Sequence, residues 1–245
     1  MPELLVLAIG AAVAGFVQGV SGFAFSMVAL SIWAWTIEPR LAAAMAVCGG
    51  LSGQLFNAAT VRRGLYLPLL RPFLAGGALG VPLGVLLLPT LDPARFKLVL
   101  GIALLACCSG MLFARRLPSV ARFGRAGDLL AGAVGGAMGG LGGITGAVPA
   151  LWCTLRGLER DAQRAVVQNF NLIALSATLA AMLVSGTVRL DMLGGLAVVV
   201  PALLLPSWIG SRVYLGLDAA RFRQVVLVVV ALAGAAMIAA SFRAP

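Results

Sequence analysis

The sequence predicts an all-α integral membrane protein that is built from two inverted structural repeats. Composition is the first reason: of 245 residues, 61% are hydrophobic and only 11% are charged, and the mean hydropathy is +1.05. A soluble domain has about 25% charged residues, so this chain has too little polar surface to cover a water-soluble globule. The other reasons are apolar runs of membrane-spanning length and a glycine pattern that occurs twice. Each repeat is expected to hold one glycine-broken long segment, re-entrant or kinked, plus three transmembrane helices.

The apolar runs set the number of helices. A helix needs about 20 apolar residues to cross a hydrocarbon core of roughly 30 Å. Six runs have this length: Leu41–Val61, Pro72–Thr90, Leu98–Ala114, Ala165–Ser185, Met192–Ser211 and Gln224–Ser241. Two further runs, Leu4–Ile37 and Leu129–Leu155, are longer, and glycines interrupt both near the middle. The first of these is too long for one span and too short for two.

The two halves of the chain resemble each other. Three glycines of the first long run recur in the second with the same spacing, 121 positions further along: Gly15 and Gly136, Gly19 and Gly140, Gly22 and Gly143. The heptapeptide that begins at Leu91 also matches the one that begins at Leu217 in five of seven positions. We therefore expect a first membrane repeat in residues 1–114, a basic cytoplasmic linker in 115–127 and a second membrane repeat in 128–245.

The net charge of +10 bears on orientation. In a soluble protein it would suggest nucleic acid, but here the arginines lie between apolar runs, where they act as topology signals and contact lipid headgroups. We therefore expect membrane lipid, and no nucleic acid, as a partner. If both long runs cross once, the 18 Lys and Arg divide nine to nine between the two sides. If both long runs enter and return on the same side, the Lys and Arg residues divide thirteen to five. The side with thirteen is then expected to be cytoplasmic.

The re-entrant arrangement makes each repeat cross the membrane an odd number of times, so the second repeat is inverted relative to the first. Both termini then lie outside the cytoplasm. The single-pass alternative stays open at this point, because a long helix broken by glycine can tilt or kink.

The two glycine clusters have two interpretations. Glycine in a helix costs about 1 kcal/mol relative to alanine, and one reason to keep it is close packing of helices, as in GxxxG pairs. The other is a broken helix whose exposed backbone N–H groups bind an anion inside a protein cavity. The duplication and two nearby hydroxyl groups favour the second interpretation. The candidate substrate-binding residues from the clusters are Gly19, Ser21, Gly22, Phe23, Gly140, Gly143 and Thr145.

Uncharged polar side chains in the spans that follow add further candidates. Asn57, Gln168 and Asn171 need hydrogen-bonding partners in a membrane, so they are expected to face the interior of the bundle. These side chains have two possible roles, which the sequence supports about equally. They can form hydrogen bonds between helices, or their amide N–H groups can donate to substrate oxygens.

Other chemistry finds little support in the sequence. The eight acidic residues lie at span ends or in loops, which argues against a proton relay through a carboxylate at a span centre. The chain contains no histidine, and its four cysteines lie within apolar runs, so neither a metal site nor a cofactor nor a catalytic residue is expected. No Walker-type phosphate loop or hydrolase motif occurs, and the protein is not expected to be an enzyme.

The chain resembles the TauE/SafE sulfite-exporter family of mostly prokaryotic membrane permeases over nearly its whole length. The elements that carry the resemblance are Gly15, Gly19 and Gly22, then Arg62-Arg63-Gly64, the second glycine cluster with Pro149, and Gly210-Ser211-Arg212 before Leu217. The common family pattern in the first cluster is three consecutive glycines and a proline. This chain departs from it, because it reads Gly19-Val20-Ser21-Gly22-Phe23-Ala24-Phe25 and has no proline there.

The resemblance implies a multi-pass protein of the prokaryotic cytoplasmic membrane that transports small sulfur-containing or organic anions, such as sulfite, sulfonates or sulfoacetate, often outward. Together with the repeats, it predicts a secondary transporter that works by alternating access. A passive anion channel and a non-transporting membrane assembly or accessory protein are the alternatives. A coupling ion, sodium or a proton, and a second copy of the chain are further candidate partners.

Overall fold

The structure is a computed structural model, and it describes residues 2–60, 64–114, 121–213 and 219–242. Residues 115–120 of the predicted linker lie outside the described residues, as do five arginines of the charge count, Arg62, Arg63, Arg115, Arg116 and Arg243. The remainder of the predicted linker, residues 121–127, is helical. Ala121–Phe123 form a short 3-10 helix, and α6 begins at Gly124.

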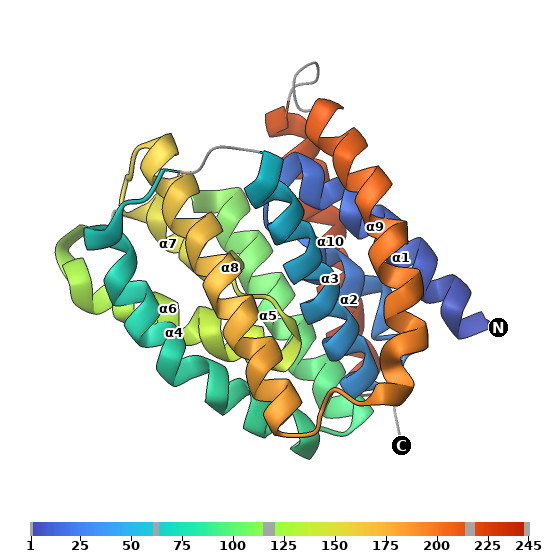
Figure 1. The fold of residues 1–245 in the computed structure, drawn as a ribbon. Coiled ribbons are helices and arrows are strands. Elements are labelled where there is room, and N and C mark those ends of the chain that lie inside the picture. Colours follow the sequence, from blue (N-terminus) through green and yellow to red (C-terminus); the bar gives the residue numbers. More distant parts are fainter. Residues whose placement is uncertain (1, 61–63, 115–120, 214–218, 243–245) are drawn as a thin grey trace.

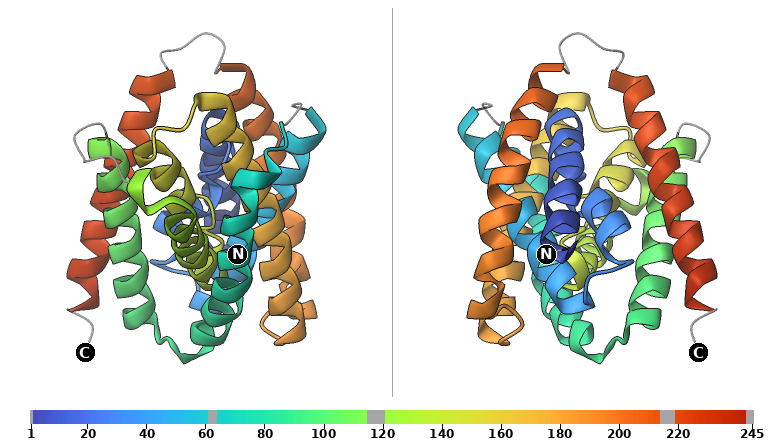
Figure 2. Two further views of the ribbon diagram at one scale, coloured as in Figure 1. Left: turned by 90° about the vertical axis from the view of Figure 1, so that its left-hand side faces the viewer. Right: turned by 90° about the vertical axis from the view of Figure 1, so that its right-hand side faces the viewer.

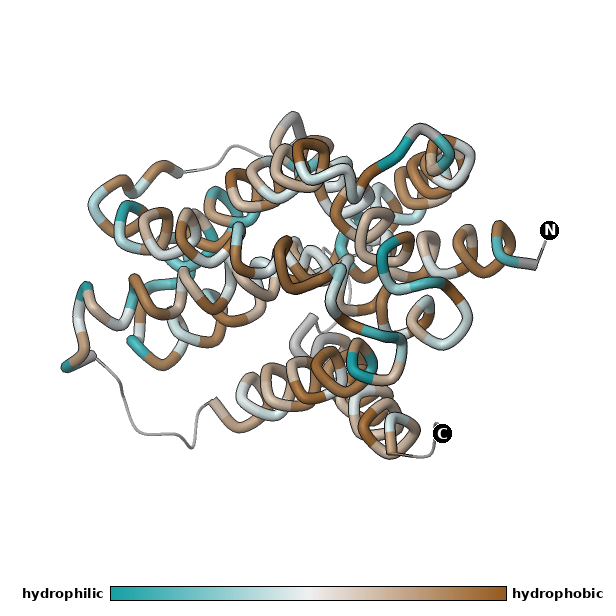
Figure 3. Tube along the Cα trace, turned by 90° about the horizontal axis from the view of Figure 1, so that it is seen from below, coloured by the Kyte–Doolittle hydropathy of each residue, from teal (hydrophilic) through white to brown (hydrophobic). Residues whose placement is uncertain are grey.

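The described residues form a bundle of ten α-helices (Figure 1). They are α1 (Pro2–Ser21), α2 (Phe25–Trp33), α3 (Pro39–Thr60), α4 (Leu67–Leu87), α5 (Pro93–Phe113), α6 (Gly124–Gly142), α7 (Ala147–Leu155), α8 (Arg160–Val184), α9 (Leu193–Val213) and α10 (Ala219–Ser241). Seven of these described helices, all except α2, α6 and α7, are long and apolar enough to cross a membrane. The prediction of an all-α multi-pass membrane protein is confirmed. In Figure 3, apolar colours run along the helices, and the most hydrophilic segments lie mostly near helix ends.

Helix starts follow local rules of capping. Asp92 precedes α5, and its Oδ1 accepts a hydrogen bond from the backbone N–H of Arg95 at 2.8 Å, while Pro93 occupies the first helical position. Glu38 precedes α3 in the same way, with Oε2 accepting from the N–H of Leu41 at 3.0 Å. The polar residues between the apolar runs therefore fix where these helices begin.

Helices α3, α4 and α5 run alternately up and down in Figure 1, and so do α8, α9 and α10. The ends of α3 and α9 lie at the upper end of the molecule, and the turns that join α4 to α5 and α8 to α9 lie at the lower end. Helices α5 and α10 pack against each other along one flank (Figure 2). Helices α3 and α8 contact each other inside the bundle.

Glycines allow α4 to pack directly on α6 and α1 on α9. A Cβ atom added at Gly136 of α6 would lie 2.8 Å from the carbonyl oxygen of Gly77 in α4. One added at Gly15 of α1 would lie 2.6 Å from that of Leu203 in α9. The backbones approach so closely that only glycine fits, which is the small-residue packing typical of membrane helices. This packing joins a helix of each half to a helix of the other.

The short helices α2 and α7 turn back along the long helices that precede them. Trp33, the last residue of α2, donates from Nε1 to the carbonyl oxygen of Val6 near the start of α1, at 3.1 Å. Trp152 near the end of α7 donates from Nε1 to Asp128 near the start of α6, at 2.8 Å. Each pair is therefore a helical hairpin, and we call them hairpin 1 (α1 and α2) and hairpin 2 (α6 and α7).

Candidate functional site

Each hairpin turns at a glycine with left-handed backbone geometry. Gly22 has φ of +85° and Gly143 has φ of +74°, values that side chains other than glycine rarely tolerate. The N–H of Gly22 donates to the carbonyl oxygen of Gln18 at 2.7 Å, and that of Gly143 donates to Gly139 at 2.6 Å. Both glycines thus occupy the position after the last helical turn, where an αL residue commonly ends a helix.

Helix α3 holds the turn of hairpin 1. Gln54 donates from Nε2 to the carbonyl oxygen of Gly22 at 2.7 Å, which satisfies an acceptor that the end of α1 leaves open. The hydroxyl of Ser26, in the first turn of α2, donates to the carbonyl oxygen of Ala46 at 3.1 Å. A Cβ atom added at Gly22 would lie 3.3 Å from Nε2 of Gln168, so α8 closes the other side of this turn.

The two hairpins meet just beyond their turns. A Cβ atom added at Gly146 would lie 3.2 Å from Cβ of Phe23 in the other hairpin and 3.3 Å from Oδ1 of Asn171 in α8. Thr145 donates from Oγ1 to the same Asn171 Oδ1. Phe23 packs against both hydrophobic clusters of the protein, and so it lies between the two halves of the core.

These contacts define one group of residues, which we call the tip cluster. It consists of Ser21, Gly22, Phe23, Gln54, Gly143, Thr145, Gly146, Gln168 and Asn171. All of its polar side chains are neutral, and Gln54, Thr145 and Asn171 are at most 2% exposed. The polar side chains on α3, α8 and the turn of hairpin 2 are therefore buried, while Ser21, Gly22 and Phe23 at the turn of hairpin 1 are partly exposed.

The backbone supplies the polarity of the tip cluster. Helices α2 and α7 both begin there, and their N-cap residues, Ala24 and Gly146, make no side-chain capping hydrogen bond. The start of a helix carries a partial charge of about +0.5 and N–H groups without partners inside the helix. The ends of α1 and α6 bring carbonyl groups of the opposite polarity to the same place. The arrangement can bind an anion through its N–H groups and amides without a positively charged side chain.

Two predicted site residues lie in a different environment. Gly19 packs against the backbone of Ser207 and Ser211 in α9, and a Cβ atom added at Gly140 would lie 2.5 Å from the backbone nitrogen of Val85 in α4. These two glycines are in close helix contacts, as in the packing interpretation. The other predicted glycines, Gly22 and Gly143, are at the turns.

Asn57 is buried, 6% exposed, on α3 and lies three residues after Gln54, so the two share a face of that helix. Sequence reasoning left Gln54 and Gly146 out of the site, and it did not predict the contact of the neighbouring Ser26 with α3. The first two had a signal in the sequence: Gln54 is a polar residue within an apolar run, and Gly146 belongs to the second glycine cluster. Ser26 had none, because its role depends on where α3 passes the turn.

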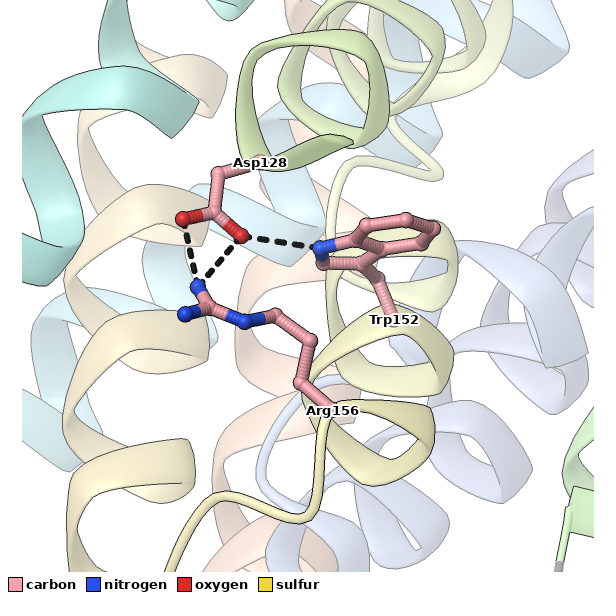
Figure 4. Close-up of polar contacts among 3 residues, drawn as sticks. All are labelled: Asp128, Trp152 and Arg156. Carbon is pink, nitrogen blue, oxygen red and sulfur yellow. Dashed lines mark hydrogen bonds and ion pairs between the residues drawn. The ribbon is translucent and has the colours of Figure 1, made fainter. Parts of the chain in front are cut away.

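A buried ion pair closes the base of hairpin 2 (Figure 4). Nη1 of Arg156 lies 2.6 Å from Oδ1 and 2.5 Å from Oδ2 of Asp128, and Trp152 donates to the same carboxylate. The side chain of Asp128 is 2% exposed and that of Arg156 is 18% exposed. Asp128 is near a helix end, as predicted, but its burial was not visible in the sequence because the partner lies 28 residues away.

No group of three or more metal-ligating side chains occurs among the described residues. The model of the sulfite exporter TauE/SafE family matches residues 7–237, a range that includes the whole tip cluster, all of hairpin 2 and hairpin 1 except the first residues of α1. No curated protein and no solved structure matches the chain. The family match covers nearly the whole sequence and agrees with the multi-pass helical fold, so the chain belongs to the sulfite exporter TauE/SafE family of membrane transporters.

Proposed function

We propose that the protein is a secondary transporter that exports small sulfur-containing or organic anions, such as sulfite, sulfonates or sulfoacetate, across the prokaryotic cytoplasmic membrane by alternating access. The observation that carries the proposal is the meeting of two hairpins, one from each half of the chain, in a neutral polar cluster between α3 and α8. Paired broken helices near the centre of a bundle are a recurring substrate site in secondary transporters.

The helix pairings support an inverted-repeat design. If α1 to α5 correspond to α6 to α10, then the contact of α1 with α9 has its counterpart in the contact of α6 with α4. The contacts of α5 with α10 and of α3 with α8 are their own counterparts, as a twofold relation requires. Three crossings per half, with each hairpin returning to its side of entry, invert the second half relative to the first. The division into repeats at 1–114 and 128–245 is part of this proposal.

The cations whose side chains the structure describes support one orientation. Seven lie at helix ends of the upper end of the molecule: Arg71, Arg122, Arg125, Arg156, Arg160, Arg164 and Arg212. Four lie at the lower end: Arg40, Arg95, Lys97 and Arg189. The positive-inside rule assigns the upper end to the cytoplasm, which leaves both termini outside it.

The tip cluster has the groups that a sulfite or sulfonate oxygen needs. The backbone N–H groups at the starts of α2 and α7 and the amides of Gln168, Asn57 and Asn171 are the candidate donors to substrate oxygens. Helix dipoles in place of charged side chains bind an anion without holding it so tightly that release becomes slow. Gly19 and Gly140 then act by allowing α1 and α6 to move against α9 and α4 at close contact.

The opposite directions of the two hairpins support alternating access. Hairpin 1 has its base at the lower end and hairpin 2 at the upper end, so displacement of either one opens the tip cluster to one side only. Export of one negative charge from a cell that is negative inside gains about 2.3 kcal/mol per 100 mV. The membrane potential alone can therefore drive outward transport, and a sodium ion or a proton can add to it.

Efflux of labelled sulfite from proteoliposomes tests the proposal. A transporter shows saturation and counterflow, a passive channel shows flux with neither, and an accessory protein shows no flux. The variants Gly22→Leu and Gly143→Leu should abolish flux, because each adds a side chain at a turn with positive φ inside the tip cluster. Gly194→Leu is the matched control, because its added Cβ has no atom within 4 Å. Unchanged transport in correctly inserted Gly22→Leu and Gly143→Leu proteins would refute the site.

A further inference from the structure

An open apolar groove runs along the outside of hairpin 2, away from the tip cluster. Its volume is about 320 Å³, and its walls include Phe123, Leu130 and Val134 from the α6 side and Val148 and Trp152 from α7. Phe123, Leu130 and Val134 are 49 to 63% exposed, so the groove opens outward from the bundle. In a membrane protein this direction is the bilayer.

The groove has the length of one lipid chain in one leaflet. From Phe123, just before α6, to Val134 within it there are eleven residue steps, or about 16 Å at the helical rise per residue. Half of a hydrocarbon core of roughly 30 Å is about 15 Å. The groove begins at the upper end of the molecule, where α6 starts, and ends part of the way along that helix.

The floor of the groove is fixed. The ring of Trp152 lies directly over Gly127, where any side chain would collide with it. Its Nε1 donates to Asp128, which Arg156 also holds, so the indole is tied to the base of hairpin 2 (Figure 4). A molecule in the groove therefore rests on the residues that tie the end of α7 to the beginning of α6 at the base of hairpin 2.

Positive charge gathers at the upper end of the groove. Arg122 and Arg125 are exposed there, and the guanidinium of Arg122 lies 5.0 Å from the centre of the Phe123 ring. Neither arginine forms a salt bridge with a described acidic residue. The neighbouring carboxylate, Asp128, is neutralised by Arg156. The end of the groove thus offers two unpaired cations above an apolar channel.

We propose that this groove is a binding site for one anionic phospholipid. The phosphate group lies between Arg122 and Arg125, and an acyl chain lies along Leu130, Val134 and Trp152. Charge complementarity selects an anionic headgroup, and the apolar walls and their length select an acyl chain. The site is separate from the tip cluster, and the proposal does not depend on what the protein transports.

Native mass spectrometry of the full-length protein in detergent, titrated with phosphatidylglycerol or phosphatidylcholine, tests the site. We expect one phosphatidylglycerol to bind with about 30-fold preference, which is the factor that two basic residues near an anionic lipid supply. Arg122→Gln with Arg125→Gln should remove that preference. Val134→Trp should reduce binding of both lipids at least tenfold, because the indole fills the groove.

Arg212→Gln is the matched control, since Arg212 also lies at the upper end over an aromatic ring, Trp208, at 4.9 Å, but away from the groove. It should bind phosphatidylglycerol like the unmodified protein. Equal loss in Arg212→Gln, or full preference in the double arginine variant, would overturn the proposal. So would disulfide formation between two copies of a Leu130→Cys variant that phosphatidylglycerol fails to suppress, because the groove would then belong to a dimer interface.

Discussion

The guanidinium of Arg156 and the carboxylate of Asp128, 2.5 Å apart, join the end of α7 to the beginning of α6. A buried pair of this kind is costly to break, because the partner that is left behind is a charge without compensation. In hairpin 1 the corresponding link is a single neutral hydrogen bond, from Trp33 to the backbone of Val6. The two hairpins are therefore closed at their bases by interactions of very different strength.

Removal of one member of this pair should destabilise the protein strongly. We expect Asp128→Asn to lower the free energy of unfolding by about 3 kcal/mol, because it leaves Arg156 unpaired at a largely buried position. Asp128→Asn combined with Arg156→Gln should recover part of that loss. Thermal unfolding in detergent measures both. Asp191→Asn is the control, since its pair with Arg189 is mostly exposed and worth less than about 1 kcal/mol.

Close contact between α4 and α6 should make the glycines there intolerant of any side chain. A methyl group at Gly80 would overlap the carbonyl group of Ala133, and backbone atoms cannot move aside as a flexible side chain can. We expect Gly80→Ala to destabilise the protein by about 1 to 3 kcal/mol. Gly194→Ala, in open space within α9, should be neutral or slightly stabilising because alanine favours helix. Equal melting temperatures for the two variants would contradict this.

Phe23 should limit the size of the transported anion. Its side chain is next to Gly146 and Asn171, so Phe23→Ala creates space where the two hairpins meet. We expect the ratio of sulfoacetate to sulfite transport to rise several-fold, with sulfite transport reduced less than tenfold. Phe16→Ala serves as the control, since Phe16 packs edge-to-face on Phe222, away from the tip cluster. A ratio that changes equally in both variants would show that Phe23 does not select substrates.

A substitution at Asn171 tests the effect of a negative charge in the tip cluster, because aspartate has nearly the same shape as asparagine. Asn171→Asp keeps an oxygen that accepts from Thr145, but it places a carboxylate at a position that is 2% exposed, so its melting temperature should fall and transport is compared in the correctly inserted fraction. A negative charge in the tip cluster repels an anion, and we expect the KM for sulfite to rise at least tenfold. Asn171→Leu should lose the hydrogen bond but repel nothing. If the leucine variant transports worse than the aspartate variant, the tip cluster does not bind an anion.

Labelling of single cysteines distinguishes the two topologies. Glu38 and Glu159 are exposed and occupy matching positions in the two halves. With re-entrant hairpins, Glu38→Cys and Glu159→Cys lie on opposite sides of the membrane, and an impermeant thiol reagent labels only the first in intact cells. With single kinked passes the two positions lie on the same side. The four native cysteines are buried, which keeps the background low.

Sequence reasoning found the membrane-spanning helices, for physical reasons. Apolar length and glycine spacing are local properties, so the spans and the turns at Gly22 and Gly143 were accessible. The partners of those turns were not, because Gln54 and Ser26 act through the register of α3 against hairpin 1. The same limit explains Gly19 and Gly140, whose spacing fits both packing and binding until the neighbouring helix is known.

The pairing of α1 with α9 and of α4 with α6 has a consequence for synthesis. The glycine face of α1 around Gly15 finds its partner at Leu203, which leaves the ribosome only when most of the chain has been made. Until α9 has been made, the glycine face of α1 has no helix to pack against and faces lipid. Each half therefore depends on the other for the partner of its most closely packed helix, α1 on α9 and α6 on α4.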